Sequence, residues 1–315
     1  MSIGPRTRAL LSTTSRTRRH HITASYAALT QACTTTGDDA RGAELVATDP
    51  HDVWTLPGSR AIARVHTDSA EAWALLRGAR LLAQHRVAVV APFYDALRAG
   101  GRAVTFWHEP GRLLREAAAL GGWVTAGVHR IRPGAAPWLQ EHDPFAGLLD
   151  GLDDAPLEGA ACRFLRERAV RLRQEWAAID WPTPATVILG TRGMARCHDD
   201  GTCPRFALRR PLWRGRREWD LVAARWRGEL LRGHRDDQQA HHDAYLAHTR
   251  ADVALPYPHI GAWPHYQSVR DVVVLTAVMD LVRQAHLDSR TRQLAAHQVA
   301  CLRGAHPAPW DWGKR

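Results

Sequence analysis

Apolar positions follow a two-residue period in the first third of this chain and a helical period in most of the rest. Short runs rich in Val, Ile, Thr and Trp predict strands, because these residues suit a half-buried pleated surface. An apolar stripe from Ala72 to Leu82 interrupts them and predicts a helix over residues 69–85, with Ser69 as its N-cap. The predicted strands are residues 43–47, 52–56, 61–66, 87–93 and 102–107, preceded by a short helix over 25–33.

The pattern becomes mainly helical after Gly111, where Pro110 and Gly111 end both strand and helix. Three strand-like runs, 186–189, 194–198 and 204–208, interrupt the helices, and residues 133–144 form the most loop-like linker. The predicted helices are 112–120, 144–148, 158–179, 219–231, 237–249, 266–286 and 291–302.

This order of elements predicts an α+β fold with two lobes. Residues 22–107 form a small sheet lobe with one helix, residues 108–111 a hinge, and residues 112–315 a larger, mainly helical lobe. Residues 1–21 carry five arginines and two histidines among Ser and Thr without an apolar signal core, which predicts a mobile basic tail.

The charge of the chain favours anionic partners. It has 42 basic and 32 acidic residues, a formal charge of +10, yet Lys314 is its only lysine and it contains no asparagine. Such a balance suits phosphates, nucleic acid or acidic peptides. A GC-rich genome produces the same Arg- and Ala-rich composition, so nucleic acid stays the less favoured partner.

Five cysteines without a CxxC pair argue against a disulfide framework and indicate reduced thiols in a cytoplasmic protein. Cys197, His198 and Cys203 lack the ligand number of a zinc site, and Asp199-Asp200-Gly201 predicts a turn between two strands. No apolar run approaches the roughly 18 residues of a membrane span. The sequence therefore predicts neither a bound metal nor a membrane partner.

Several segments occur in the order and at the intervals of one known family. They include Val104-Thr105-Phe106-Trp107, Gly111-Arg112-Leu113-Leu114 and, most distinctive, Gly215-Arg216-Arg217-Glu218-Trp219-Asp220-Leu221. From about Ala28 to Ala285 the chain resembles the aminoglycoside phosphotransferase family, bacterial small-molecule kinases with a protein-kinase-like fold. The resemblance implies that Asp220 braces the backbone of the catalytic loop from a helix.

The resemblance also implies where the chemistry of phosphoryl transfer belongs, and those positions are altered. Such a site needs a strand lysine, a helix glutamate, a catalytic Asp, and an Asn and a second Asp for magnesium. Here the lysine position falls on Arg64 and the glutamate position near Arg77. The base becomes Thr191, the Asn becomes Arg196, and the second Asp falls at Leu208 or Arg209.

These replacements predict a pseudokinase that acts as a ligand-binding or scaffolding protein, with no catalytic residue and no metal. Its partner is an unidentified protein or a small anionic ligand. The candidate anion or nucleotide site, used without metal, consists of Arg64, Trp107, Glu109, Arg196 and Arg209. Two alternatives stay open. One is a drifted cleft with solvated arginines, and the other is a repurposed small-molecule transferase that is ATP-dependent or uses Arg64, Thr191, Arg192, Arg196 or the Asp199-Asp200 pair.

Two further sets of side chains can be explained either by structure or by function. His241, His242 and Tyr245 fall where the resemblance implies acceptor binding, and surface histidines are the expected explanation. Trp310 and Trp312 form either an exposed docking motif or part of the packing of the helical lobe.

Overall fold

A computed structural model describes residues 3–13, 16–48, 50–114, 117–190, 197–199, 201, 203–232, 235–249 and 256–312. The chain divides into two compact units. The first, here called the sheet unit, comprises Met1–Arg115 and Arg196–Leu212, and the second, the helical unit, comprises Glu116–Ala195 and Trp213–Arg315. The segment 196–212 thus packs with the sheet, whereas the sequence analysis assigned every residue after 111 to the helical lobe.

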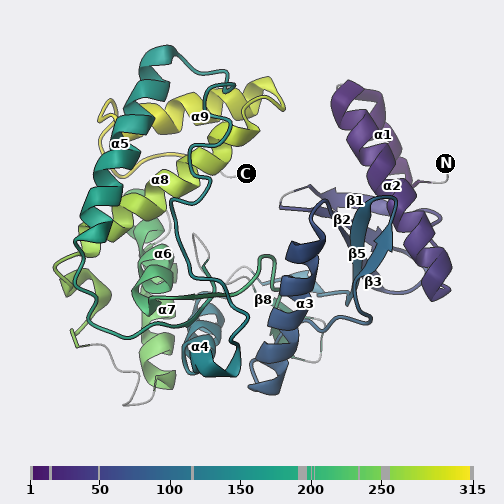
Figure 1. The fold of residues 1–315 in the computed structure, drawn as a ribbon, viewed down its shortest axis with the longest axis horizontal. Coiled ribbons are helices and arrows are strands. Elements are labelled where there is room, and N and C mark those ends of the chain that lie inside the picture. Colours follow the sequence, from purple (N-terminus) through teal and green to yellow (C-terminus); the bar gives the residue numbers. More distant parts are fainter. Residues whose placement is uncertain are drawn as a thin grey trace. The chain divides into compact units, whose positions relative to one another are not determined.

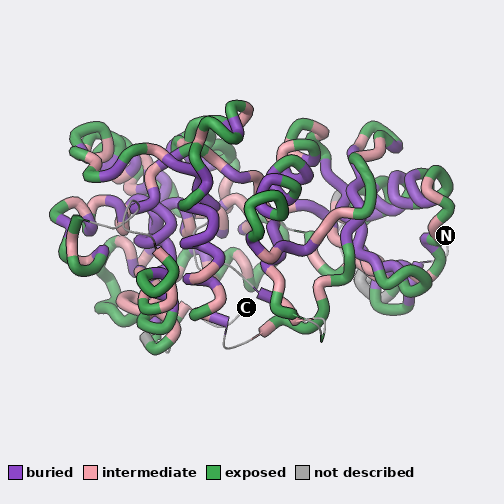
Figure 2. The backbone as a smooth tube through the Cα atoms, turned by 90° about the horizontal axis from the view of Figure 1, so that it is seen from below, coloured by how far each residue is buried: buried purple, intermediate pink, exposed green. Residues whose placement is uncertain are grey.

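The sheet unit is built on five antiparallel strands in the order β1-β2-β3-β5-β4 (Figure 1). Four of them match predicted strands, and β4 was not predicted. Central strand β3 is buried at every residue. Figure 2 shows that buried residues gather in the interior of each unit. The strands are β1 (Glu44–Ala47), β2 (Asp52–Leu56), β3 (Ala61–His66), β4 (Leu97–Ala99) and β5 (Arg102–His108).

The chain begins with two helices, α1 (Pro5–Thr13) and α2 (Arg16–Thr36). The helix predicted over 25–33 is part of α2, whereas α1 and the first turns of α2 lie in residues 1–21, which were expected to form a mobile tail. The difference has a physical cause, because both helices are tied to the sheet. Gly4 N donates to the Ala43 carbonyl at 3.0 Å, and Ile22 and Leu29 are wholly buried in the core beside β2 and β3. Trp54 in β2 donates its indole N–H to Ser25 Oγ at 3.1 Å.

The predicted long helix is α3 (Ser69–Gln84), and its N-cap is Asp68, not Ser69. The Asp68 carboxylate accepts the Ala70 N–H at 2.8 Å, which satisfies one free donor of the first turn. The helix approaches the returning segment closely at Gly78, where an added Cβ would lie 3.1 Å from a methyl carbon of Leu208.

A three-stranded sheet explains why the segment 196–212 joins the sheet unit. Its strands are β6 (Arg112–Leu113), β8 (Cys197–Asp199) and β9 (Pro204–Phe206), in the order β6-β8-β9. Phe206 also exchanges main-chain hydrogen bonds with Ala88 and Val90, at 2.8 and 2.9 Å. The hairpin predicted around Asp199-Asp200-Gly201 is confirmed by the pairing of Cys197 with Phe206.

Three predicted elements of the sequence analysis are wrong. The predicted strand 87–93 makes only isolated bridges at Val89 and Pro92. The predicted helix 112–120 begins instead at Ala118, because Gly111 turns the chain at φ +76° and residues 112–113 pair with β8. Residues 144–150 form turns, where a helix over 144–148 was predicted.

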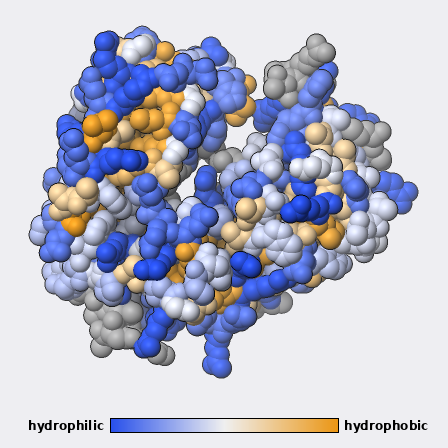
Figure 3. Space-filling view, viewed as in Figure 1, coloured by the Kyte–Doolittle hydropathy of each residue, from blue (hydrophilic) through white to orange (hydrophobic). Residues whose placement is uncertain are grey.

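The helical unit is organised around α8 (Tyr266–Gln284), which is buried on most of its circumference, in line with the apolar run Val272–Val278 that only Thr276 interrupts. A two-stranded sheet pairs β7 (Thr186–Ile188) with β10 (Trp213–Gly215), and β10 was not predicted. Figure 3 shows a mostly hydrophilic surface with apolar side chains gathered beside α5. The other helices are α4 (Ala118–His129), η1 (Pro133–Ala135), α5 (Gly159–Ala177), α6 (Arg217–Leu230), α7 (Arg235–His248), η3 (Ile260–Ala262) and α9 (Ser289–Leu302).

The two C-terminal tryptophans pack on this unit, which decides between the two readings of that segment. Trp310 N donates to the Leu230 carbonyl at 2.6 Å, and the rings of Trp226 and Trp312 lie 5.5 Å apart. The five cysteines are all free thiols, in line with their odd number and spacing. Within the described residues, no helix is both long and apolar enough to cross a membrane.

Gly122→Ala tests the close packing of α4 on α7. An added Cβ would lie 2.1 Å from the His241 carbonyl oxygen, so the helices must separate. We expect the free energy of unfolding to fall by about 1–3 kcal/mol or more, measured by urea denaturation. Gly134→Ala is the control, because nothing lies within 4 Å of its Cβ. Equal stability of the two variants would contradict this packing.

Candidate functional site

Asp220, on the first turn of α6, is the centre of a buried hydrogen-bond network in the helical unit. Its side chain is 3% exposed, and its two oxygens accept main-chain N–H groups from the loop after β7: Leu189 N at 2.7 Å and Gly190 N at 3.0 Å. The bracing role that the resemblance implied for Asp220 is thus present for the first two loop residues. Gly190 has φ +61°, and the Trp213 ring leaves no room for a Cβ there.

His129, from the last turn of α4, completes the environment of Asp220. Its Nε2 lies 3.1 Å from Asp220 Oδ2 and its Nδ1 lies 3.1 Å from the hydroxyl oxygen of Tyr245 on α7. Because a carboxylate only accepts, His129 Nε2 carries a proton and donates it to Asp220. Burial raises the pKa of Tyr245 to about 12, so the phenol remains a donor. The carboxylate therefore has three donors and is almost wholly buried.

The sequence analysis missed this network. His129 carried no motif, and Tyr245 was assigned to the acceptor region. His241 was expected on the surface, but it is 3% exposed and its Nε2 lies 3.4 Å from Thr125 Oγ1. Burial lowers the pKa of His241 to about 4. The one sequence signal for this network was Gly122 in α4. A glycine there lets α7 pack closely on α4, because a Cβ would collide with the His241 carbonyl oxygen.

The sheet unit holds the residue at the lysine position, Arg64, on β3 opposite Thr105 of β5. Its side chain is 3% exposed, and its Nη1 donates to the Leu208 carbonyl. The guanidinium carbon lies 4.3 Å from the ring centre of Trp107, which is also fully buried. Burial, with a contribution from nearby Arg209, lowers the pKa of Arg64 to about 9, so the group stays charged at neutral pH.

Two buried histidines lie next to Arg64. The rings of His51 and His66 are 4.4 Å apart, and His66 Nε2 lies 3.2 Å from the Thr105 hydroxyl, which accepts the Trp107 N–H at 2.8 Å. Burial and the charge of Arg64 lower the pKa of both, to about 4 for His66. Both rings are therefore neutral at pH 7. Their Nδ1 atoms have no hydrogen-bond partner within the described part of the chain.

Of the candidate anion site, the structure brings Arg64, Trp107 and Arg209 together. Glu109 is exposed, just beyond the end of β5, and donates its main-chain N–H to the Arg60 carbonyl at 3.1 Å. Thr191 and Arg196 lie outside the described residues.

The positions that the resemblance assigned to the helix glutamate and the second Asp hold no carboxylate: Arg77 is exposed on α3, and Leu208 is buried. Asp199, from the carboxylate pair of the transferase alternative, accepts the Gly201 N–H at 2.8 Å within its turn. Across the described residues, no three His, Cys, Asp or Glu side chains are grouped so that they could hold a metal ion.

A five-stranded sheet unit with one long helix after its third strand, and a helical unit whose α6 aspartate braces the loop after β7, define a two-lobed kinase-like phosphotransferase fold. Solved structures bear this out. The microcompartment-associated aminopropanol kinase has a TM-score of 0.59 at 12% identity, covering 86% of this chain and 94% of its own.

Two further structures extend the likeness. A choline/ethanolamine kinase family protein from Mesorhizobium loti has a TM-score of 0.55 at 15% identity, covering 85% of this chain and 88% of its own. A thermostable mutant of the aminoglycoside phosphotransferase APH(4)-Ia has a TM-score of 0.57 at 10% identity, covering 88% and 99%. The resemblance seen in the sequence is thus confirmed at the level of the fold. No protein-family model and no curated protein sequence matches the chain.

The buried histidines predict that stability falls on acidification. In the unfolded chain a histidine is protonated below about pH 6.5, whereas His66 and His241 stay neutral in the folded protein down to about pH 4. Between these values the unfolded state binds more protons, so the free energy of unfolding decreases as pH falls. Urea denaturation at pH 7.5, 6 and 5 measures the slope.

His241→Gln, which removes one of these groups, is expected to flatten this pH dependence. Exposed His286 provides the matched variant, His286→Gln, which is expected to keep the wild-type slope. Equal stability of the wild-type protein at pH 7.5 and pH 5 would show that the buried imidazoles do not control this dependence.

Proposed function

We propose that this protein is a pseudoenzyme of the phosphotransferase fold, a scaffold that does not transfer phosphate. The observation that carries the proposal is the state of Arg64. At a position where a kinase-like site needs a cation that reaches nucleotide phosphates, this guanidinium is 3% exposed, bonded to the Leu208 carbonyl and packed on Trp107. Its charge joins β3 to the segment 196–212 and is withdrawn from solvent.

The rest of the chain supplies no replacement. Lys314 is the only lysine and asparagine is absent, so neither a second phosphate-binding lysine nor a magnesium-binding asparagine exists anywhere in the sequence. Magnesium requires oxygen ligands, and the position of its second Asp falls on Leu208 or Arg209. A threonine at position 191 cannot accept the proton of an acceptor hydroxyl, and loss of a positioned base costs about 10²- to 10⁴-fold in rate.

A second candidate function is binding of a small anion or nucleotide without metal, through Arg64, Arg209 and Arg196. Positive charge near Arg64 supports anion binding, because Arg209 is close enough to lower the pKa of the Arg64 guanidinium. Bidentate guanidinium groups bind phosphate without a cation. For this function Arg64 must leave the Leu208 carbonyl. The scaffold function requires no such change.

The third candidate is a repurposed transferase. The structural neighbours bear the names of kinases and phosphotransferases for aminopropanol, choline or ethanolamine, and aminoglycosides. An amino alcohol is therefore the acceptor class to test.

We place the scaffold in the bacterial cytoplasm, with an unidentified protein as its partner.

Calorimetric titration of ATP, with and without Mg²⁺, and an assay of ADP release with amino alcohols separate the three functions. The scaffold predicts no binding heat in either titration and no ADP above background. Heat without Mg²⁺ that Arg209→Ala removes and Arg41→Ala keeps would replace the scaffold by anion binding. Magnesium-dependent ADP release with an acceptor would overturn the pseudoenzyme altogether.

A further inference from the structure

Two buried histidine nitrogens in the sheet unit lack a hydrogen-bond partner. They are the Nδ1 atoms of His51 and His66, and within the described residues nothing pairs with them, although the two residues are only 5% and 1% exposed. Their rings lie 4.4 Å apart, because His51 directly precedes β2 and His66 ends β3, where Asp52 pairs with Val65. A buried polar atom without a partner is costly, so these two nitrogens require a group that satisfies them.

The hydrogen bonds of Thr105 assign the proton of the His66 ring. The Thr105 hydroxyl oxygen accepts the Trp107 indole N–H at 2.8 Å and lies 3.2 Å from His66 Nε2. Because burial lowers the pKa of His66 to about 4, the ring is neutral at pH 7 and carries one proton. The assignment that gives the hydroxyl proton an acceptor has Thr105 donating to Nε2, which leaves the ring proton on Nδ1. His66 Nδ1–H is then a buried donor without an acceptor.

The charge around the two rings selects an anion as that acceptor. Arg64 lies two residues before His66 on β3 and shares its face of the sheet, because alternate strand residues point to the same side. Its charge lowers the pKa of both histidines, and Arg209 and Arg210 act on His51 in the same direction. A cation held at the two nitrogens would be repelled by these guanidinium groups, whereas an anion would be attracted.

The buried charge of Arg64 lacks a counter-charge among its contacts in the described part of the chain. Its guanidinium contacts the Leu208 carbonyl and the Trp107 ring, and neither group carries a net charge. A buried guanidinium without an anionic partner is costly. The same anion that accepts from His66 would therefore also offset the cost of burying Arg64.

The two acidic residues nearest to this cluster along the chain have other contacts. Asp52 pairs with Val65, on the opposite face of β3 from His66, and its carboxylate lies 2.9 Å from His21 Nε2. Asp68 accepts the N–H of Ala70 at the start of α3, and its effect on the pKa of His66 is smaller than that of Arg64. The anion therefore has to come from solution.

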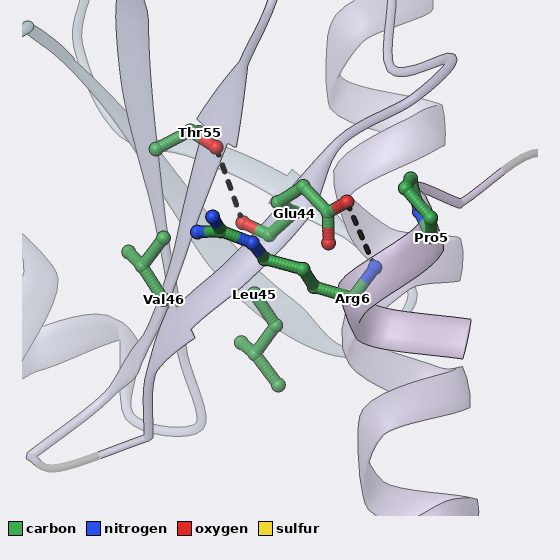
Figure 4. A pocket seen from close by; sticks show the side chains of 6 residues that line it. All are labelled: Pro5, Arg6, Glu44, Leu45, Val46 and Thr55. Carbon is green, nitrogen blue, oxygen red and sulfur yellow. Dashed lines mark hydrogen bonds between the residues drawn. The ribbon is translucent and has the colours of Figure 1, made fainter. Parts of the chain in front are cut away.

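The surface groove beside β1 shows the contrasting case of a site that the chain satisfies by itself. It has a volume of about 550 Å³, and the Glu44 carboxylate lies in it (Figure 4). This carboxylate accepts the main-chain N–H groups of Arg6 and Thr7 at 3.1 and 2.8 Å. The groove therefore lacks the unsatisfied buried donor that the two histidines provide.

We propose that the sheet unit binds a chloride ion beside His51, His66 and Arg64. His66 Nδ1–H donates to the ion, His51 donates from Nδ1 when its ring proton lies there, and the guanidinium supplies the opposite charge. A monatomic anion suits this place, because it needs about the space of one water molecule. The site uses no nucleotide and not Arg196. It does not rest on the proposed function, so its failure leaves the nucleotide titrations and their meaning unchanged.

Urea denaturation of the full chain in sodium chloride and in sodium gluconate, at equal ionic strength and pH 7.5, tests the proposal. An ion that binds only the folded protein raises the folding equilibrium constant linearly once its concentration exceeds Kd, and we expect an increase of at least about fivefold in chloride. His51→Leu is expected to abolish this increase. His85→Leu, at an exposed histidine of the same unit, is the matched control and is expected to keep it.

Bromide provides a second measurement that does not depend on the stability of a variant. Crystals of the wild-type protein grown in sodium bromide are expected to show an anomalous-scattering peak beside His66 Nδ1 and the Arg64 guanidinium. Absence of this peak would overturn the proposal. Equal chloride stabilisation of His51→Leu and His85→Leu would overturn it in favour of a general salt effect.

Discussion

The loop after β7 in the helical unit depends on the hydrogen bonds that the buried carboxylate of Asp220 accepts. A desolvated carboxylate is tolerated only when its oxygens are fully hydrogen-bonded, and here Leu189, Gly190 and His129 supply the donors. The loop after β7 therefore starts from a fixed backbone position, whatever its later residues do. This requirement belongs to the fold and remains when a site loses its chemistry.

The sheet unit solves a related problem in a different way. Arg64 is buried, and burying its charge without a carboxylate partner is costly. The Leu208 carbonyl and the face of Trp107 offset part of that cost, and the neighbouring histidines His51 and His66 remain neutral. Arg64 holds β3 to the returning segment 196–212 through the Leu208 carbonyl. Asp220 thus fixes the start of a loop in the helical unit, and Arg64 fixes a returning segment in the sheet unit.

The sequence predicted much of the fold because its signals were local. The stripe from Ala72 to Leu82 and the alternation in β2 and β3 need no knowledge of partners, and the segment ending in Asp220 fixed the family likeness. Other features depend on contacts far along the chain. Residues 1–21 look like a tail until the helices that they form pack on the sheet, and residues 112–113 look helical until β8 pairs with them. His129 could not be predicted, because only the approach of α7 at Gly122 brings Tyr245 to its ring.

Hydrogen–deuterium exchange followed by mass spectrometry with residue-level fragmentation, with and without Mg²⁺ and ATP, tests the central claim that the support of the loop persists without the nucleotide chemistry. We predict slow exchange of the Leu189 and Gly190 amides, comparable with the interior of α6, and no change on adding Mg²⁺ and ATP. Fast exchange at these two amides would contradict the brace. Nucleotide-dependent protection of them, or of β3, would contradict the pseudoenzyme.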